Sequence, residues 1–121
     1  IDQLSSIRLS PIEKVETKKD EKQEDANADV QYIDHFGNAV TNIHREYFEK
    51  MNSGNRFRLD IMHVTELNTV SDSYADVPPG ELLCRFNRNG LLEICVNQGS
   101  AASLFGLRTG SKHNYLKITF E

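Results

Sequence analysis

The chain has 121 residues, 38% of them hydrophobic and 8% aromatic, which suits one domain with a modest core and excludes a second full domain. Its formal net charge is −4, so it lacks the basic surface that binding to a nucleic-acid backbone requires, and no nucleic-acid partner is expected. No run approaches the roughly 20 apolar residues of a membrane span, and no signal peptide is recognised. We expect a cytoplasmic domain with no membrane partner.

The first 29 residues divide at Pro11 into two segments of different character. The chain begins at Ile1 rather than at a methionine, which suggests a piece of a longer protein. Apolar residues at positions 1, 4 and 7 are spaced like the end of a helix, and Pro11 would stop it. Seven acidic and four basic residues then crowd between positions 13 and 29. We expect residues 12–29 to form a charged, flexible linker.

From residue 30 onward the apolar pattern is mostly that of strands. It predicts strands at residues 30–33, 39–43, 57–61, 82–86, 92–96 and 116–120. Two short helices are predicted, one from about His44 to Met51 and one from Ser100 to Leu104, with Ser100 as N-cap and Gly106 as the stop. Frequent turn signals favour an antiparallel sheet that closes on itself. The expected fold class is mainly β, a small antiparallel β-barrel with two short helices.

Residues 82–96 predict a hairpin whose register follows from the apolar alternation. Both strands place their apolar residues on one face only if the loop has an odd number of residues, so a three-residue loop with Gly90 in the left-handed conformation fits. That register sets Cys84 opposite Ile94. It also sets Arg85 opposite Glu93, which predicts a cross-strand charge pair.

Cysteine and histidine usage indicates neither a disulfide nor a metal centre. In the predicted hairpin Cys95 points to the face opposite Cys84, so two reduced thiols in a reducing compartment are expected. No metal is expected, because the histidines lack the spacing of a metal site; they are His35, His44, His63 and His113. No nucleophile elbow, phosphate-binding glycine loop or dinucleotide fingerprint appears in the sequence.

The densest group of polar residues lies within residues 32–43, between two predicted strands. Gly37 allows a backbone conformation in which Asp34, Phe36 and Asn38 can point into a common space, which would make the turn a small binding cradle. The alternative is that Asp34 and Asn38 only satisfy the backbone of their own turn through Asx-type hydrogen bonds. The turn by itself leaves both interpretations open.

Two further segments carry weaker signals. Asn97, Gln98 and Gly99 precede the predicted helix at Ser100, where backbone amides could receive an electron-rich ligand atom, although a simple helix cap is the commoner use of such a sequence. Residues 74–80 begin with Tyr74 and end in Pro-Pro-Gly, which indicates a strand that runs into a rigid turn. Neither segment identifies a function alone.

Taken in order, four segments resemble the C-terminal domain of the S-adenosyl-L-methionine (SAM) hydroxide adenosyltransferases, which include the SAM hydrolases and are related to the fluorinases and chlorinases. The segments are residues 32–43, 74–80, 87–94 and 97–102. The resemblance covers nearly all of residues 30–121, and residues 1–11 resemble the end of the family's interdomain segment. It implies an enzyme whose larger N-terminal domain is missing from this chain. No catalytic residue is therefore expected here, and the chain alone is expected to be inactive.

The resemblance also implies roles for individual residues. In the family, SAM lies between the N-terminal domain of one subunit and the C-terminal barrel of a neighbour in a trimer, and its hydrolysis gives adenosine and methionine. On the matching positions Asp34 would face the methionine ammonium, and Phe36 and Tyr74 would pack against the adenine. Asn38 would hydrogen-bond the adenine edge. These roles are chemically sensible. A carboxylate attracts a cation, aromatic faces stack on a base, and an amide can both donate to and accept from the edge of that base.

Two other stretches complete the implied site. The backbone around Asn97, Gln98 and Gly99 would add to adenine recognition, and the turn at Arg88 and Asn89 would lie near the methionine carboxylate. The family commonly has Asn-Ser before this turn, whereas this chain reads Asn-Arg-Asn-Gly at residues 87–90. Arg88 either replaces a hydroxyl contact with a charge-assisted one or points to solvent.

The leading hypothesis is therefore the substrate-binding C-terminal domain of a SAM hydrolase. Its expected partners are SAM, adenosine, methionine, its own N-terminal domain and neighbouring subunits in a homotrimer, with SAM as substrate and no cofactor. The alternative is a non-catalytic module that binds a small molecule or mediates oligomerisation. The choice between water and a halide would be made in the missing domain, and hydroxide transfer is the default as the family's commonest activity.

Overall fold

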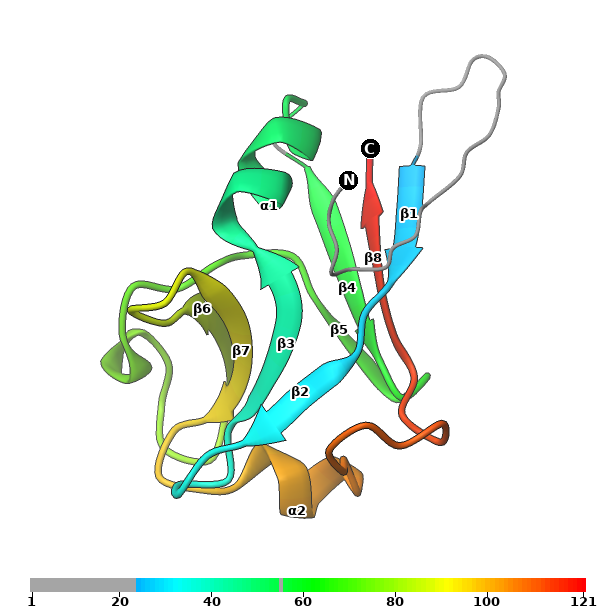
Figure 1. The fold of residues 1–121 in the computed structure, drawn as a ribbon. Coiled ribbons are helices and arrows are strands. Elements are labelled where there is room, and N and C mark those ends of the chain that lie inside the picture. Colours follow the sequence, from blue (N-terminus) through cyan, green and yellow to red (C-terminus); the bar gives the residue numbers. More distant parts are fainter. Residues whose placement is uncertain (1–23, 55) are drawn as a thin grey trace.

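The computed structural model describes residues 24–54 and 56–121, which form two four-stranded antiparallel sheets and short helices (Figure 1). Sheet A has the strand order β1-β8-β4-β5, and sheet B has the order β2-β3-β7-β6. The strands are β1 (Glu24–Asn27), β2 (Val30–Ile33), β3 (Ala39–His44), β4 (Phe57–Ile61), β5 (Thr65–Leu67), β6 (Leu82–Phe86), β7 (Leu91–Val96) and β8 (Leu116–Phe120). The helices are α1 (Arg45–Met51), the 3-10 helix η1 (Tyr74–Asp76) and α2 (Ala101–Phe105).

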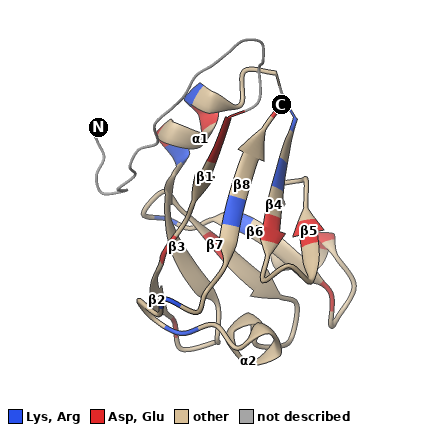
Figure 2. Ribbon diagram, turned by 90° about the vertical axis from the view of Figure 1, so that its right-hand side faces the viewer, with Lys and Arg blue, Asp and Glu red and all other residues tan. Residues whose placement is uncertain are grey.

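Sheet A follows from strict alternation of apolar and polar residues. In β4 the side chains of Phe57, Leu59 and Ile61 are buried, and their polar neighbours face outward. Leu59 lies opposite Ile118 of β8, and β8 pairs with β1 along its other edge. The outward face carries charges of both signs on these strands, as the blue and red segments of Figure 2 show. Such a face is a solvated surface.

Sheet B is buried on both faces of its two central strands. Every residue of β3 from Ala39 to Ile43 is buried, and so is every residue of β7 from Leu92 to Val96. One face packs against the core. The other is covered in part by the segment between β5 and β6, where the Tyr74 hydroxyl donates to Glu93 Oε2 of β7 at 3.4 Å.

The main core lies between the two sheets and is closed at one end by α1. Phe48, the buried residue of this helix, packs edge-on against Phe57, Phe86 and Phe120, with ring centroids 5.0–5.8 Å apart. These rings come from β4, β6 and β8, so a single helical side chain contacts strands of both sheets. Such edge-to-face aromatic contacts add to the stabilisation from burial itself.

The expected closed barrel is not found among the described residues. No ladder of hydrogen bonds joins sheet A to sheet B there, and the sheets end at β5 and β6. The nearest approach to closure is an isolated bridge between Val70, beyond β5, and Cys84 of β6. Next to this bridge the N–H of Ser71 donates to the Cys84 carbonyl oxygen at 2.8 Å, and the chain then turns into η1 instead of continuing along β6. The rest of the predicted fold class is confirmed: the domain is mainly β, its sheets are antiparallel, and it has two short α-helices.

Two local predictions need correction. Residues 24–27, placed in the charged linker, form strand β1, with Ala26 opposite Ile118 of β8; residues 1–23, including the segment predicted to end at Pro11, lie outside the described residues. Residues 74–76, interpreted as part of a strand, form the helix η1. Its cause is a capping box, in which Ser73 Oγ accepts from the N–H of Ala75 while the Asp76 side chain accepts from the N–H of Ser73.

The predicted hairpin and helix caps are confirmed. Gly90 has φ +81°, and the register sets Cys84 opposite Ile94 and Arg85 opposite Glu93. The Ser100 hydroxyl accepts from the N–H of Ser103 at 3.1 Å, and Gly106 ends α2 with φ +69°. A strand that the sequence did not predict, β5, pairs antiparallel with β4 through the turn at residues 62–64.

Both cysteines are buried free thiols, as the register predicted. Burial raises the pKa of Cys84 to about 12. Burial and the nearby Glu93 carboxylate raise the pKa of Cys95 well above its usual range. Both thiols are therefore protonated at neutral pH and are poor nucleophiles.

Candidate functional site

The polar turn between β2 and β3 is held by the carboxylate of Asp34. The Asp34 N–H donates to the Asn38 carbonyl oxygen at 3.0 Å, and the Gly37 N–H donates to the Asp34 carbonyl oxygen at 3.0 Å. Asp34 Oδ1 accepts from the N–H groups of Phe36 and Asn38 at 2.9 and 3.0 Å. One carboxylate oxygen thus satisfies the turn in the Asx manner, which leaves Oδ2 for other partners.

The turn is fixed against helix α2, next to which it lies at one end of sheet B (Figure 1). The N–H of Ala102 in the first turn of α2 donates to the Gly37 carbonyl oxygen at 2.9 Å. Gly37 has φ +85°, a conformation that favours glycine. The glycine in this segment therefore serves both the turn and its contact with the helix.

The side-chain amide of Asn38 begins a continuous chain of hydrogen bonds. Asn38 is only 2% exposed, and its Nδ2 donates to Asp34 Oδ2 and to the Tyr74 hydroxyl oxygen, at 3.0 Å each. The Tyr74 hydroxyl in turn donates to Glu93 Oε2 at 3.4 Å. Arg85 Nη1 donates to the same oxygen at 2.8 Å, which closes the predicted cross-strand charge pair. This polar network, Asp34-Asn38-Tyr74-Glu93-Arg85, joins three distant segments on the covered face of sheet B.

Burial and charge keep the Tyr74 hydroxyl protonated at neutral pH. Burial, the adjacent Cys95 thiol and the Glu93 carboxylate all raise the pKa of Tyr74, so its hydroxyl retains the proton. Two carboxylates, Asp34 and Glu93, and the guanidinium of Arg85 leave one net negative charge. The local field therefore favours a cationic ligand over an anionic one.

Aromatic side chains stand exposed next to this network. Phe36 is 72% exposed and contacts the ring of His35 edge-on at 5.4 Å between centroids. Tyr74 is 37% exposed although its hydroxyl belongs to the network, and Arg85 Cζ lies 5.2 Å from the centre of its ring. Flat apolar faces beside buried hydrogen-bonding groups are the elements of a site for a planar heterocycle.

The segment before α2 reaches the same end of sheet B. Asn97 Nδ2 donates to the Val77 carbonyl oxygen at 2.9 Å, and the Asn97 carbonyl oxygen accepts from the N–H of Gly80 at 2.7 Å. These bonds tie the segment to the end of the loop that carries Tyr74. Gln98 has φ +60°, an uncommon value for a residue other than glycine and a frequent sign of a functional turn. Gln98 itself is exposed.

Arg88 and Asn89 lie elsewhere. Both are exposed in the turn between β6 and β7, which adjoins the start of α1, where the N–H of Arg45 donates to the Gly90 carbonyl oxygen at 2.8 Å. Strand β3 begins at the polar turn and ends beside this second turn, so the two turns are separated by six residues of strand, about 20 Å. The sequence grouped Arg88 and Asn89 with the polar turn, but the structure places them at the opposite end of sheet B.

Sequence reasoning did not connect Arg85 and Glu93 with the site. It predicted the pair but not its link to Asn38 through Tyr74. The available signal was alternation: with Leu92 and Ile94 in the core, Glu93 and Cys95 must point to the other face of β7. A buried charge on that face requires a partner there.

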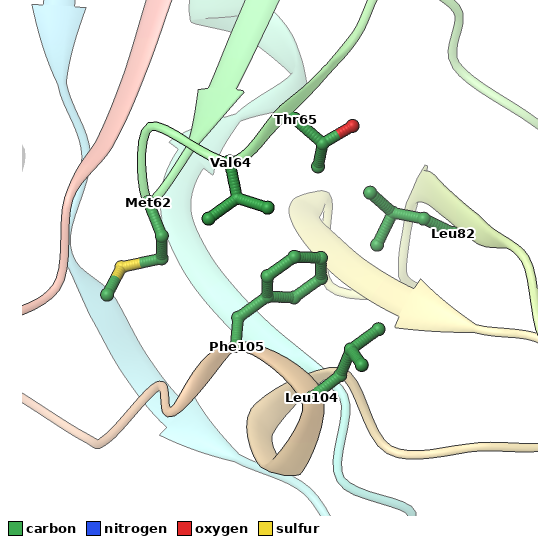
Figure 3. A pocket seen from close by; sticks show the side chains of 6 residues that line it. All are labelled: Met62, Val64, Thr65, Leu82, Leu104 and Phe105. Atoms are coloured by element: carbon green, nitrogen blue, oxygen red, sulfur yellow. The ribbon is translucent and has the colours of Figure 1, made fainter.

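The described residues also form an apolar hollow away from this network. It has a volume of about 510 Å³ and lies between the turn that follows β4 and helix α2 (Figure 3). Its lining residues are Met62, Val64, Thr65, Leu82, Leu104 and Phe105. None of the side chains predicted to bind ligand contributes to it.

The described residues contain neither a membrane-spanning helix nor a cluster of metal ligands. Within residues 24–54 and 56–121, no helix is both long and apolar enough to cross a membrane. The same part of the chain contains no group of three or more histidine, cysteine, aspartate or glutamate side chains arranged to hold a metal ion.

The fold and the site together define a small two-sheet β domain whose polar network and exposed aromatics suit the binding of a small planar molecule. The family model described as the SAM hydroxide adenosyltransferase C-terminal domain matches residues 28–114. The chain belongs to this family.

Individual relatives agree with the family match. Over 92 residues the chain is 31% identical to the (R)-S-adenosyl-L-methionine hydrolase of Salinispora tropica, and the match covers 76% of this chain and 32% of that protein. The chain thus spans about a third of the length of this curated relative.

Solved structures extend the comparison to the fold. A crystal structure of an uncharacterized conserved protein from Thermotoga maritima matches 88% of this chain and 41% of its own, with a TM-score of 0.61 and 29% identity. A conserved hypothetical protein from Thermus thermophilus matches 76% of this chain and 33% of its own, with a TM-score of 0.52 and 24% identity, and shares the fold.

Proposed function

We propose that this chain is the substrate-binding C-terminal domain of a SAM hydrolase, which converts SAM and water into adenosine and methionine. One observation carries the proposal. In this member of the family, the buried Asn38 amide lies beside two exposed aromatic side chains, Phe36 and Tyr74. An amide at the edge of a base and π faces against its plane are the contacts that bind an adenine.

The proposed contacts divide the ligand between two parts of the site. The rings of Phe36 and Tyr74 pack against the adenine, and Asn38 bonds its edge. Asp34 faces the cationic methionine ammonium, in keeping with the net negative charge of the network. The backbone at Asn97 and Gln98 adds to adenine recognition, and the left-handed conformation of Gln98 supports a role for that turn.

Arg88 and Asn89 are not part of this proposed site. The ammonium and carboxylate of methionine share one carbon atom, so a ligand whose ammonium meets Asp34 cannot place its carboxylate some 20 Å away. An exposed Arg88 is consistent with the alternative that its side chain points to solvent. In our proposal, Arg88 therefore does not take over the hydroxyl contact that is typical of the family at this turn.

In the proposed reaction, the oxygen of water attacks the C5′ carbon of the SAM ribose. The bond between C5′ and the sulfonium sulfur breaks, its electron pair stays on sulfur, and methionine leaves as a neutral thioether. The attacking water gives up one proton. The described residues contribute orientation and selective binding. We place the groups that activate the water and hold the ribose in an N-terminal domain of a longer protein, with the site completed by a neighbouring subunit of a homotrimer.

An amide NMR titration of the chain with adenosine, followed by SAM, tests this proposal. We expect localised shifts of the backbone signals of Phe36, Asn38, Tyr74 and Gln98, with the signals of His63 and Arg88 unmoved as internal references. No shift at millimolar adenosine would overturn a preformed adenine site in this chain and would favour a non-catalytic module. Shifts confined to the apolar hollow would contradict the placement of the site.

A further inference from the structure

The polar network fixes which way the Asn38 amide faces. Asp34 Oδ2 belongs to a carboxylate and can only accept, so the Asn38 atom 3.0 Å from it must be the NH2 nitrogen. At the other end Glu93 also only accepts. It receives the one proton of the Tyr74 hydroxyl, whose oxygen must then accept from Asn38. Each hydrogen bond that links Asp34, Asn38, Tyr74 and Glu93 therefore has only one possible donor and one possible acceptor.

The consequence is that both N–H donors of Asn38 are used inside the protein. One goes to Asp34 and the other to Tyr74. Within residues 24–54 and 56–121, no group donates a hydrogen bond to Asn38 Oδ1. A ligand that meets this side chain therefore meets an acceptor.

We infer that Asp34 is a specificity-determining residue for the nucleobase, because it orients the Asn38 amide so that Oδ1 selects a base with an exocyclic amino group over one with an oxo group. This inference rests on the proposed function, in which Asn38 bonds the edge of a purine. A 6-aminopurine donates to Oδ1, whereas a 6-oxopurine presents a second acceptor there and leaves both oxygens unpaired. The role is separate from the proposed contact of Asp34 with the methionine ammonium.

The variant Asp34→Asn tests this role while keeping the turn. Its Oδ1 still accepts from the N–H groups of Phe36 and Asn38, but an NH2 group replaces Oδ2. Two NH2 groups would then face each other, so the Asn38 amide rotates by half a turn and accepts from residue 34. The Tyr74 hydroxyl turns its proton from Glu93 to Asn38 Oδ1 at the same time, and Glu93 keeps its bond from Arg85. The face turned to the ligand changes from acceptor to donor.

Adenosine and inosine are the probes, since neither carries the methionine group and the ammonium contact does not enter the measurement. Affinities come from amide NMR titration of the whole chain. We expect the chain to bind adenosine at least about tenfold more tightly than inosine, and we expect Asp34→Asn to bring that ratio to one or below. Asp60→Asn is the matched control: Asp60 Oδ1 caps a turn of sheet A by accepting from the N–H of His63 at 3.0 Å. It should leave the ratio unchanged.

The outcomes separate this inference from the proposed function. Equal affinity for the two nucleosides in the unmodified chain, or an unchanged preference in Asp34→Asn, overturns the inference and leaves adenine binding intact. Failure of both nucleosides to bind overturns the proposed adenine site.

A second measurement does not need a ligand. In the unmodified chain the Asn38 NH2 protons should show nuclear Overhauser contacts to the Tyr74 ring, and these should weaken in Asp34→Asn as the amide rotates. Persistence of the contacts in a folded Asp34→Asn variant would show that Asp34 does not orient Asn38.

Discussion

Gly37 and Ser100 lie so close together that the turn after β2 and the start of α2 form one unit. A Cβ atom on Gly37 would be 2.6 Å from Cβ of Ser100, and it would also meet the Ser100 hydroxyl. Ser100 is the N-cap of α2, so it cannot move away without loss of its bond to the N–H of Ser103. The geometry of the proposed site thus depends on the absence of a side chain at position 37.

Gly37→Ala should therefore destabilise the domain through both backbone strain and steric overlap. We expect a loss of about 3 kcal/mol in the free energy of unfolding, measured by urea denaturation. Gly90→Ala is the matched control, because Gly90 has nearly the same φ but nothing within 4 Å of the added Cβ. It should cost about 1 kcal/mol. Equal losses in the two variants would mean that the contact with Ser100 carries no weight.

The parts of the fold that the sequence predicted are those governed by local periodicity. Alternation in residues 82–96 gave the loop length and the pairing of Arg85 with Glu93, because a shift by one residue would expose every core side chain. The helix α2 was predictable since Ser100 and Gly106 are typical residues for their positions.

The missed elements lack such local signals. The turn before β5 has Met62 and His63 at φ +55° and +58°, where glycine or asparagine would have indicated a hairpin. Long-range contacts hold it instead: the Met62 N–H donates to the Tyr115 carbonyl oxygen at 2.7 Å, and the His63 and Tyr115 rings stack at 3.7 Å. No sequence window contains those partners.

The candidate site was predictable only in part for a similar reason. The polar turn was evident from residues 34–38, and the resemblance added Tyr74. The link between them is a hydrogen bond across 36 residues, and its continuation to Glu93 depends on which face of β7 the loop covers. The separation of Arg88 from Asp34 likewise follows from the length and direction of β3, which residue-by-residue matching does not show.

Arg85→Met should destabilise the domain, since it leaves the buried Glu93 carboxylate without its counter-charge. Because the Arg85 side chain is 27% exposed and solvent screens the pair, we expect a loss of about 2 kcal/mol in urea denaturation. Lys117→Met is the control, as its partner Asp25 lies 3.3 Å away on the exposed face of sheet A. That change should cost less than about 0.5 kcal/mol. A loss for Arg85→Met no larger than the control's would show that Glu93 does not need the guanidinium.

Stability should fall at alkaline pH because of the buried thiol of Cys84. Its pKa rises from 9.0 to about 12 on folding, so the neutral thiol is favoured in the folded chain. The corresponding stabilisation is complete below pH 9 and is lost as the pH rises from 9 to 12, because the unfolded chain releases the proton first. Between about pH 8 and about pH 10.5 the loss from this one group is about 2 kcal/mol.

Cys84→Val isolates that contribution. Its free energy of unfolding should differ from that of the unmodified chain by a constant between about pH 6 and 8, and it should decline less steeply above about pH 9. Burial and the charges of Glu24 and Asp25 raise the pKa of Tyr47 to about 12. This group contributes equally to both proteins, so its effect cancels in the difference between their free energies of unfolding. Parallel curves throughout the alkaline range would contradict a buried, protonated Cys84.

Phe36→Ala should separate ligand binding from folding. The ring is 72% exposed, so its removal exposes little new surface, and we expect the free energy of unfolding to change by less than about 0.5 kcal/mol. The same ring is proposed to pack against adenine, so adenosine affinity should weaken by about 1–3 kcal/mol, or roughly 5- to 150-fold. Leu104→Ala removes a side chain that is 62% exposed at the apolar hollow and should change neither quantity. If Phe36→Ala binds adenosine as tightly as the unmodified chain, the exposure of Phe36 serves another purpose and the adenine must lie away from this turn.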